Sequence, residues 1–273
     1  MSGTLYIIGS PIGNMEDITL RQLRMLAEAD FLCAEDTRVT LKLLTRYEIK
    51  NELVSFHQHS SRADAQRIID RLLAGESCGV VTDAGMPCIS DPGEVLVKLA
   101  YENGIDVRAV PGPSAVVTAA ALSGIHLDRF TFEGFLSVNR KEREEQLGRL
   151  RGETAAMIFY EAPHKLRTTL DDLADFFGAD RQISICREIT KLHEETLRFT
   201  LAEAVSYYSE HEPRGEYVLV VKGGSPDAEK MTLEQAVEQV KKLIDMGEKP
   251  TDACKAVAKE TGFRKGELYA ALQ

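Results

Sequence analysis

The chain has 273 residues, enough for two domains, or for one large domain with an appendage, and for a sizeable hydrophobic core. Hydrophobic residues make up 44% and charged residues 28%, as in ordinary soluble globular proteins, and no apolar run approaches the roughly 20 residues of a membrane-spanning helix. The net charge of −10 argues against indiscriminate binding to nucleic acid, although it leaves room for a local basic patch.

In the first half of the chain, short apolar runs alternate with segments whose apolar residues recur at helical spacing. Thr19 is the expected N-cap of the first helix, and Gly75 ends the third. The alternation predicts an α/β domain over residues 1–124, with a mostly parallel sheet covered on both faces. The predicted strands are 5–8, 31–34, 53–56, 78–82 and 107–110. The predicted helices are 18–26, 40–47, 61–74, 93–102 and 113–123.

The second half is organised differently, because several predicted strands follow one another with little helix between them. This order predicts a second α/β domain with a mixed sheet over residues 125–224, with the boundary near 124–129. The predicted strands are 131–135, 155–160, 182–187, 196–200 and 216–221. The predicted helices are 140–151, 163–177 and 202–208.

The last part of the chain, residues 225–273, is predicted to be a small helical module. Residues 223–227 have the composition of a linker. Three helices are expected after it, at 232–246, 250–261 and 264–272, and the last two resemble a helix-turn-helix. Acidic residues slightly outnumber basic ones here, so a helical cap or dimer element and an RNA contact both remain open.

The cysteines are odd in number, and no two of them form a C-x-x-C pair. Such a pattern is typical of reduced thiols and not of a disulfide or metal framework. The amino-terminal residues enter a strand without the pattern of a signal peptide. We therefore expect a cytoplasmic protein with no bound metal and no membrane partner. The cysteines are Cys33, Cys78, Cys88, Cys186 and Cys254.

Three loops rich in glycine and proline follow predicted strands, at residues 9–14, 83–93 and 110–115. Glycine and proline fix backbone angles that other residues resist. Loops at the carboxyl ends of parallel strands are where α/β proteins place ligand contacts. Three such loops at one edge predict a ligand that is held largely by main-chain groups.

The chain has no G-x-G-x-x-G after its first strand, no P-loop lysine and no G-x-S-x-G elbow. His57 and His59 are more simply surface histidines than a metal pair, because no carboxylate or cysteine stands at ligand spacing. Glu35, Asp36 and Arg38 form either a substrate-binding cluster or a salt-bridged turn.

A basic run, Arg140, Lys141 and Arg143, follows the residues Gly134-Phe135-Leu136 at the start of the second domain. A solvated helix face is the simpler interpretation, since glutamates are interleaved with these residues. The alternative is a patch at the mouth of the cleft that contacts RNA phosphates, and we keep this alternative as a hypothesis.

Motifs along the whole chain match, in order, those of one known family. Three of them are specific to one branch: A-E-D-T-R at 34–38, F-Y-E-x-x-H-[KR] at 159–165 and R-E-[IL]-T-K at 187–191. The chain resembles the ribosomal RNA small subunit methyltransferase I branch of the tetrapyrrole methylase superfamily. The other matching segments are 10–14, 83–87, 91–93, 111–115, 134–136 and 215–217.

This resemblance implies S-adenosyl-L-methionine bound in a cleft between two α/β domains, followed by a helical tail, and a homodimer. It also implies 2′-O-methylation of one cytidine ribose in the decoding region of 16S small-subunit rRNA, with the rRNA or the 30S particle as partner. The residues that it assigns to the cofactor are Pro11, Ile12, Asp83, Ala84, Gly85, Met86, Pro87, Ile89, Ser114, Ala115, Tyr160, Glu161, Gly215 and Tyr217.

The first loop reads G-S-P-I-G-N where tetrapyrrole-modifying members have G-x-G-P-G-D, which weakens a porphyrinoid substrate. A ribose 2′-hydroxyl is a poor nucleophile, so a nearby base or cation would help. The candidates on the matching motifs are Glu161, His164, Lys165 and Lys191, and the sequence does not choose among them. Two alternatives stay open: a methyltransferase for a tetrapyrrole or other small molecule, and an S-adenosylmethionine-binding regulatory module without turnover.

Overall fold

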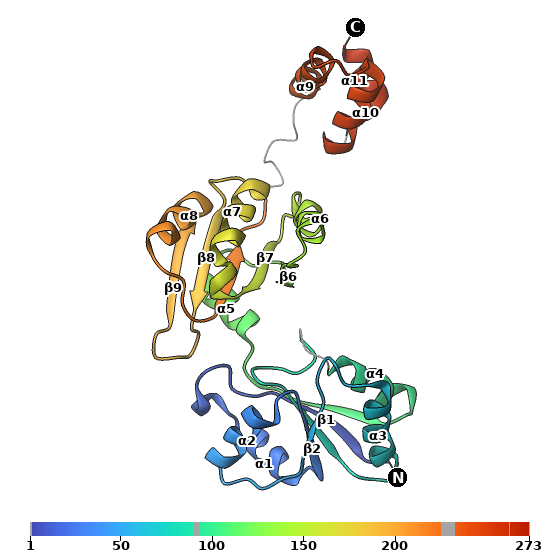
Figure 1. Ribbon diagram of the computed structural model, residues 1–273, viewed down its shortest axis with the longest axis vertical. Helices are drawn as coiled ribbons and strands as arrows, with labels where there is room; N and C mark the ends of the chain where they lie inside the picture. The colour runs from blue at the N-terminus through green and yellow to red at the C-terminus, as the bar shows by residue number, and fades with distance from the viewer. Residues whose placement is uncertain (1, 90–92, 225–232, 262, 273) are drawn as a thin grey trace. The chain divides into compact units, whose positions relative to one another are not determined.

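The computed structural model describes residues 2–89, 93–224, 233–261 and 263–272 (Figure 1). The chain divides into two compact units, Met1–Gly223 and Gly224–Gln273. The first unit holds two five-stranded sheets. The α/β fold class predicted from the sequence is therefore confirmed.

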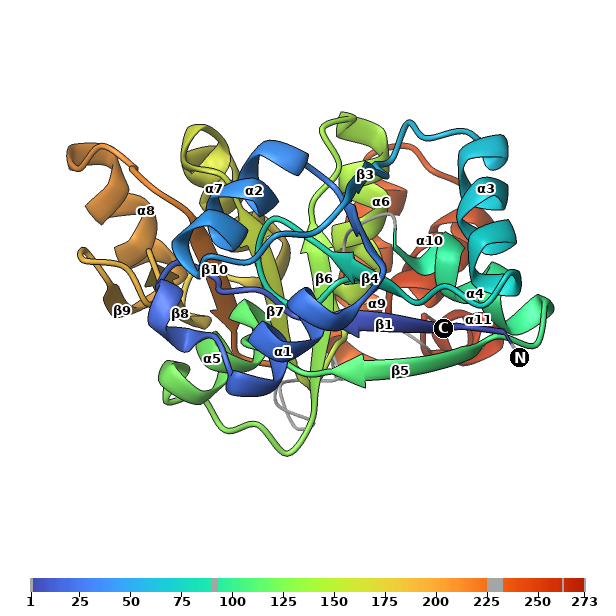
Figure 2. The same cartoon turned by 90° about the horizontal axis from the view of Figure 1, so that it is seen from below.

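The first sheet is parallel throughout, with the strand order β3-β2-β4-β1-β5. Helices α3 and α4 contribute to the buried cluster on one face, and α1 and α2 to the cluster on the other, as predicted (Figure 2). Thr19 caps α1 in a capping box with Gln22. The strands are β1 (Thr4–Ile8), β2 (Phe31–Ala34), β3 (Leu53–Ser55), β4 (Cys78–Val81) and β5 (Asp106–Val110). The helices are the 3-10 turn η1 (Met15–Asp17), α1 (Leu20–Glu28), α2 (Thr37–Arg46), α3 (Arg62–Leu73) and α4 (Glu94–Glu102).

The second sheet has the order β6-β7-β10-β8-β9 and is mixed, as predicted. Only β6 and β7 run parallel in it, and the other neighbours are antiparallel. Its strands are β6 (Phe130–Phe135), β7 (Ala156–Glu161), β8 (Gln182–Arg187), β9 (Glu195–Thr200) and β10 (Tyr217–Val221). The helices of this part are α5 (Ala115–Ser123), α6 (Arg140–Leu150), the 3-10 helix η2 (Pro163–Lys165), α7 (Leu166–Phe177) and α8 (Leu201–Glu210).

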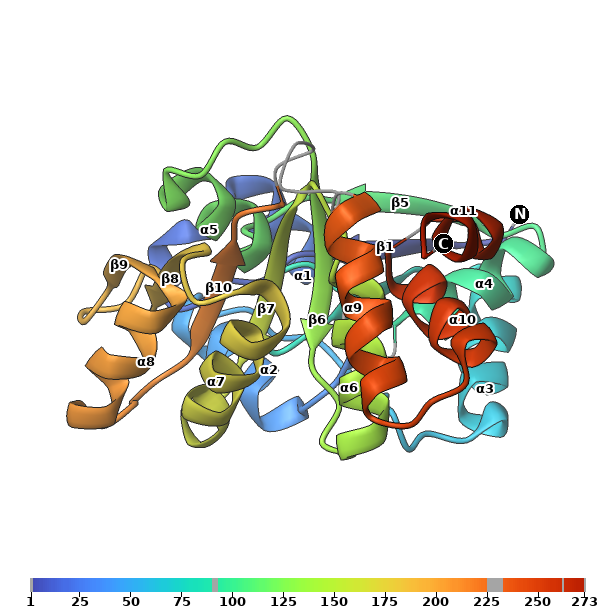
Figure 3. The same ribbon diagram turned by 90° about the horizontal axis from the view of Figure 1, so that it is seen from above.

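The two faces of the second sheet bury different helices. Residues of α6, α7 and α8 pack with Phe159 and Leu219 on one face (Figure 3). Residues of α5, among them Val116 and Ala119, pack with Ile158 on the other face. The predicted domain boundary after residue 124 stays a prediction, but α5, which precedes that boundary, packs with the second sheet.

The second unit consists, in its described residues, of three helices around their own small core. Buried residues include Val240, Cys254 and Leu268. Part of the predicted linker, residues 225–227, and Thr232 of the predicted helix lie outside the described residues. No helix in the described ranges is long and apolar enough to cross a membrane. The helices are α9 (Leu233–Asp245), α10 (Pro250–Thr261) and α11 (Lys265–Ala271).

Candidate functional site

The loops that follow β1 and β4 are joined to each other by main-chain hydrogen bonds. The Ser10 N–H donates to the Gly85 carbonyl at 2.8 Å, and the Gly85 N–H donates to the Ser10 carbonyl at 3.2 Å. The first loop (residues 9–14) and the second loop (residues 82–93, of which 90–92 are not described) therefore form one surface beyond the carboxyl ends of these strands.

The third loop, residues 111–114 after β5, joins the same surface. The Gly112 N–H donates to the Met86 sulfur at 3.2 Å, and the Gly9 N–H donates to the Val110 carbonyl at 3.0 Å. A Cβ on Gly9 would lie 2.8 Å from the Gly112 Cα, so glycine is needed for this close approach. The structure confirms the prediction that the three loops meet at one edge of the sheet.

Two buried polar side chains that the sequence analysis did not single out hold the first loop in place. Gln22 is fully buried on α1, and its amide donates to the Gly9 carbonyl at 2.5 Å. The Ser10 hydroxyl donates to the Thr82 carbonyl at 3.0 Å. The available signal was the T-x-x-Q pattern of Thr19 and Gln22, with the glutamine four residues from Ile18 and Leu26 on the apolar stripe of the helix.

Where the three loops meet, the main chains lie close together and leave little room for side chains. Gly85 has φ +84°, and a Cβ there would lie 3.3 Å from Ile12 Cγ2 and 3.5 Å from the Pro113 carbonyl oxygen. The buried Thr190 hydroxyl, on the loop after β8, has no hydrogen-bond partner among the described residues. A Cβ on Gly13 of the first loop would lie 2.8 Å from that hydroxyl. An orphaned hydroxyl beside the loops is a ready contact for a bound group.

Lys191, on the same loop as Thr190, is fixed as an ammonium by two carboxylates. Its Nζ lies 2.8 Å from Glu188 Oε1 and 2.8 Å from Glu216 Oε2. Burial acts to lower the pKa of Lys191, but the hydrogen bonds to Glu188 and Glu216 outweigh burial and raise it. Because an ammonium cannot accept a proton, this geometry favours a cationic role for Lys191 over a role as base, and the role itself stays a prediction.

Glu161 faces away from Tyr160, its neighbour on β7, because successive side chains of a strand alternate between faces. Its side chain is 3% exposed; Oε1 accepts from the Ala162 N–H at 2.8 Å, and Oε2 accepts from the Thr169 hydroxyl. The Thr169 hydroxyl in turn accepts from Arg143 at 2.8 Å. The Glu161 side chain therefore belongs to a buried network under α7, which disfavours the role as a base considered for it, and the assignment of Glu161 to the cofactor stays a prediction.

Tyr217 and Gly215, which the resemblance assigns to the cofactor, lie at the start of β10 and two residues before it. Tyr217 is buried in the same cluster as Phe159, and its hydroxyl accepts from the Arg214 N–H at 2.9 Å. A Cβ on Gly215, whose φ is +81°, would lie 2.5 Å from Glu188 Cδ. The Tyr217 side chain is thus occupied in the core, and Gly215 makes room for the carboxylate that holds Lys191.

Tyr160 and the residues just after β7 remain at the predicted edge. Tyr160 packs against the same cluster as Ile12 and Ala115, and burial raises the pKa of its hydroxyl. His164 and Lys165 lie on η2, directly beyond the strand; the His164 side chain is exposed and Lys165 is half-buried. Neither side chain makes an ion pair within the described part of the chain.

The other predicted cofactor residues differ in how exposed their side chains are on the loop surface. Asp83, Ala84 and Ile89 are exposed, whereas Pro87 is buried and Met86 is occupied by its bond from Gly112. Half-buried are Pro11, Ile12, Ser114 and Ala115.

Asp36 and Arg38 form a salt-bridged turn at the start of α2, and the adjacent Glu35 is bonded elsewhere. Asp36 caps α2, and its Oδ2 lies 2.6 Å from Arg38 Nη2, so the guanidinium lowers the pKa of Asp36 to about 2. Glu35 accepts from the Thr82 hydroxyl at 2.9 Å. Burial raises the pKa of Asp83, and so do the neighbouring carboxylates of Glu35 and Asp36. A hydrogen bond from the Asp36 N–H lowers this pKa, but it does not cancel the rise. This acidic cluster does not favour contact with phosphates.

The three residues of the basic run after β6 differ in exposure: two are exposed and one is largely buried. Arg140 is 92% exposed and pairs with Glu144, and Lys141 is exposed and lies 3.9 Å from Glu145. Arg143 is only 12% exposed and pairs with Asp172 on α7. The prediction that all three contact phosphates is therefore wrong for Arg143, whose guanidinium is already used inside the protein.

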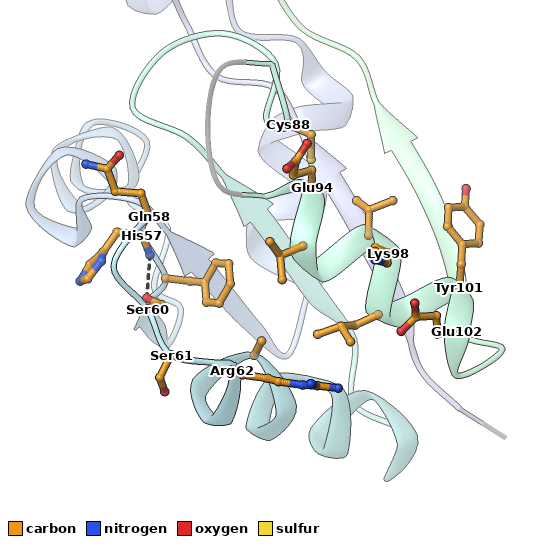
Figure 4. A pocket seen from close by; sticks show the side chains of 15 residues that line it. His57, Gln58, Ser60, Ser61, Arg62, Cys88, Glu94, Lys98, Tyr101 and Glu102 are labelled. Atoms are coloured by element: carbon orange, nitrogen blue, oxygen red, sulfur yellow. Dashed lines mark hydrogen bonds between the residues drawn. The ribbon is translucent and has the colours of Figure 1, made fainter. Parts of the chain in front are cut away.

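A hollow of about 1050 Å³ lies between the loop before α3 and α4 (Figure 4). Its described lining includes His57, Arg62, Glu94 and Lys98, and none of the predicted cofactor residues. Its lining carries both acids and bases, Glu94, Lys98 and Glu102 on α4 and Arg62 opposite them, so its charge favours no ligand class. His57 and His59 are exposed, and no group of three metal-binding side chains occurs among the described residues.

Comparisons with known proteins agree with this arrangement. A model of the tetrapyrrole (corrin/porphyrin) methylases matches residues 4–205. A relative in Halalkalibacterium halodurans, a ribosomal RNA small subunit methyltransferase I, is 44% identical over 98% of this chain and 93% of its own length. A relative of the same name in Synechocystis is 40% identical over 98% of this chain and 96% of its own.

Solved structures show the same fold at low sequence identity. A cobalt-precorrin-4 methyltransferase of cobalamin biosynthesis has a TM-score of 0.61 at 19% identity, over 80% of this chain and 94% of its own. A uroporphyrin-III C-methyltransferase from Thermus thermophilus, solved with S-adenosylhomocysteine, has a TM-score of 0.57 at 16% identity, over 81% of this chain and 97% of its own. With the matched family model and relatives of 40–44% identity over nearly the whole chain, this protein belongs to the tetrapyrrole methylase family and, within it, to the ribosomal RNA small subunit methyltransferase I family.

Proposed function

We propose that this chain, an S-adenosylmethionine-dependent methyltransferase, methylates the 2′-oxygen of one cytidine ribose in the decoding region of 16S rRNA. Its membership of the ribosomal RNA small subunit methyltransferase I family supports an rRNA substrate. The observation that carries the proposal is the union of the three loops into one surface by the Ser10–Gly85 bridge and the Gly112–Met86 bond. Methyl transfer depends on positioning, and a rigid main-chain surface supplies it.

The cofactor is held, in this proposal, on the main chain of the three loops. Ile12 and Gly85 bound the space on one side, Ser114 and Ala115 bound it on another, and the Tyr160 ring closes it from the second sheet. The supporting observations are the φ of +84° at Gly85 and the packing of Ile12, Ala115 and Tyr160 on one buried cluster. S-adenosylmethionine, when bound, supplies an electrophilic methyl group on its sulfonium sulfur.

The proton of the 2′-hydroxyl has one candidate acceptor left among the four residues considered. Glu161 is buried on the far face of β7, and Lys191 is a paired ammonium. Lys165, on η2, is a second lysine and is assigned a cationic role here. We therefore assign proton acceptance to His164, whose exposed imidazole follows β7 at the same edge as Tyr160. Lys165 and Lys191 add positive charge that favours the developing alkoxide.

RNA is held, in the same proposal, by the exposed cations of α6. Arg140 and Lys141 extend into solvent on a helix that begins five residues after β6, and their glutamate partners are themselves exposed. Exposed pairs of this kind contribute little to stability and exchange readily for phosphate. We further propose a cytoplasmic homodimer, the commonest closed oligomer.

The test is methyl transfer from labelled S-adenosylmethionine to purified 30S particles, followed by nuclease digestion and mass analysis of the nucleosides. Label in 2′-O-methylcytidine from the decoding region is expected, together with its absence from the rRNA of cells that lack the protein. Label in uroporphyrinogen and none in rRNA would replace this proposal by a tetrapyrrole methyltransferase. Tight cofactor binding with no transfer to either substrate would favour a regulatory module.

A further inference from the structure

Three aromatic side chains form a contiguous cluster at the edge of the second sheet, which we call the aromatic step: Phe132, Tyr160 and Phe135. The Phe132 and Tyr160 rings meet edge-to-face with centroids 4.9 Å apart, and the Tyr160 and Phe135 rings are tilted with centroids 5.5 Å apart. Phe132 and Tyr160 are partly buried, whereas Phe135 is 54% exposed. The last ring is therefore held by its neighbours and open to solvent.

A β-bulge in β6 places Phe135 on this face. Phe132 is paired with Ile158 and Phe135 with Tyr160, and the register shifts between Phe132 and Gly134. Without the bulge, residues three apart would point to opposite faces. The bulge, with Gly134 at φ +65°, turns both phenylalanines to the face of Tyr160, and the next residue, Leu136, enters the core of the opposite face. Bulges that re-aim a side chain are typical of functional sites.

The aromatic step is continuous with the loop surface. The Tyr160 side chain packs in the same buried cluster as Val116, in the first turn of α5, directly after the third loop. Ile12 of the first loop packs on the same cluster as Phe132 and Tyr160. Because β6 and β7 are parallel, Phe135 and the residues that follow Tyr160, including His164, lie at the same edge of the sheet.

We infer that Phe135 is a nucleobase-stacking residue, and that it receives the base of the methylated nucleotide or of its direct neighbour. This inference rests on the proposed function. An exposed aromatic ring that other rings immobilise presents a flat apolar surface at little cost in side-chain entropy. Proteins that act on single-stranded RNA use such rings to hold unstacked bases, since every base has a face that can stack. A ring at this edge orients the ribose by holding the base attached to it.

The chain contains no tryptophan, so a single introduced tryptophan reports on its own surroundings alone. We expect the emission of Phe135→Trp to be quenched by a single-stranded oligoribonucleotide with the sequence of the decoding region, and to be unchanged by S-adenosylmethionine alone. Phe130→Trp is the matched control. Phe130 is on the same strand and face, at the opposite end, and is 42% exposed. Its emission should not respond to the RNA.

A kinetic experiment asks whether the stack serves catalysis. Loss of one base–aromatic stack by Phe135→Ala should raise the KM for 30S particles about tenfold or more. Phe135→Tyr should restore the KM, and the affinity for S-adenosylmethionine, measured by calorimetry, should be unchanged in both variants. Phe130→Ala should behave as the wild type.

The outcomes separate this inference from the proposed function. If the wild type methylates 30S particles while the emission of Phe135→Trp ignores RNA and Phe135→Ala keeps the wild-type KM, the stacking role is wrong and the function stands. If the wild type methylates no RNA, the function is wrong, whatever the tryptophan emission shows. Weaker cofactor binding by Phe135→Ala, or its conversion to a species of different mass in light scattering, would also overturn the inference, in favour of cofactor packing or subunit contact.

Discussion

Arg143 provides the sharpest test of the buried network under α7, because sequence alone had grouped it with two surface cations. Its guanidinium donates to Asp172 and to the Thr169 hydroxyl, and Thr169 donates to the Glu161 carboxylate. Replacing Arg143 by Met keeps the apolar stem and removes both bonds. The variant leaves Asp172 without its cation. It also leaves Glu161, which is 3% exposed, bonded to a Thr169 hydroxyl that has lost its own hydrogen bond from Arg143.

The magnitude follows from burial. Removing one partner of a fully buried ion pair costs about 3–5 kcal/mol, and a hydrogen bond to a charged group contributes about 1.5–3 kcal/mol. Asp172 is 32% exposed, so water screens the carboxylate that is left behind and reduces the cost. We expect Arg143→Met to lower the free energy of unfolding by about 2–3 kcal/mol, which corresponds to about 4–12 °C in Tm for a unit of this size.

The assay is thermal and urea unfolding followed by circular dichroism, with Arg140→Met as the matched control on the same helix. Arg140 is 92% exposed, so its loss should leave the unfolding midpoint close to that of the wild type. A double-mutant cycle with Asp172→Asn should return a coupling of about 1 kcal/mol or more. Wild-type stability of Arg143→Met, combined with loss of RNA binding, would refute this reasoning and return Arg143 to the substrate patch.

The remaining predictions concern the loops, the paired lysine and the surface cations. Gly85→Val should abolish S-adenosylmethionine binding in calorimetry with the fold intact. Gly104→Val is the control, because Gly104 has φ +67° with open space around it, so the variant carries the same backbone strain and should bind the cofactor normally. Unchanged affinity of Gly85→Val would contradict the placement of the cofactor. The pKa of Lys191 is raised in the folded chain, so the wild type should be more stable than Lys191→Met at every pH below 10.5, the ordinary pKa of lysine. This difference in stability should vanish as the pH rises through the higher pKa of the folded state. Urea unfolding across this pH range measures the difference, and its disappearance between pH 7 and 9 would argue against the ion pairs. Replacing both Arg140 and Lys141 by Ser should weaken 30S methylation and lower the salt slope by roughly one unit per lost phosphate contact, with cofactor affinity untouched; wild-type rates across a salt series would place the RNA elsewhere. Light scattering should return about twice the chain mass of 30.3 kDa, and a monomer mass at micromolar concentration would count against the dimer.

Much of the fold was predictable because the signals that specify it are local. Apolar spacing located nearly every strand and helix to within a few residues, and the T-x-x-Q pattern marked the start of α1. The missed element was η1, a single 3-10 turn without apolar periodicity. The three loops rich in glycine and proline were visible for the same reason, since these residues act on the backbone at their own positions.

The direction in which each site residue points required the tertiary structure. Tyr160 and Glu161 are adjacent in one motif, but strand geometry sends them to opposite faces, and only packing decides which face meets the loops. The bulge that brings Phe135 beside Tyr160 leaves no mark in the apolar spacing of β6.

The sequence by itself determined the order of elements, the position of the loops and the family, because each of these depends on neighbouring residues or on motifs read along the chain. The tertiary structure decided which charges are free. Arg143 and Lys191 resemble available cations until Asp172, 29 positions away, and Glu216, 25 positions away, are brought to them. Partners at such separations are chosen by how helices and strands pack, and that choice is made by the whole core rather than by any local run of residues.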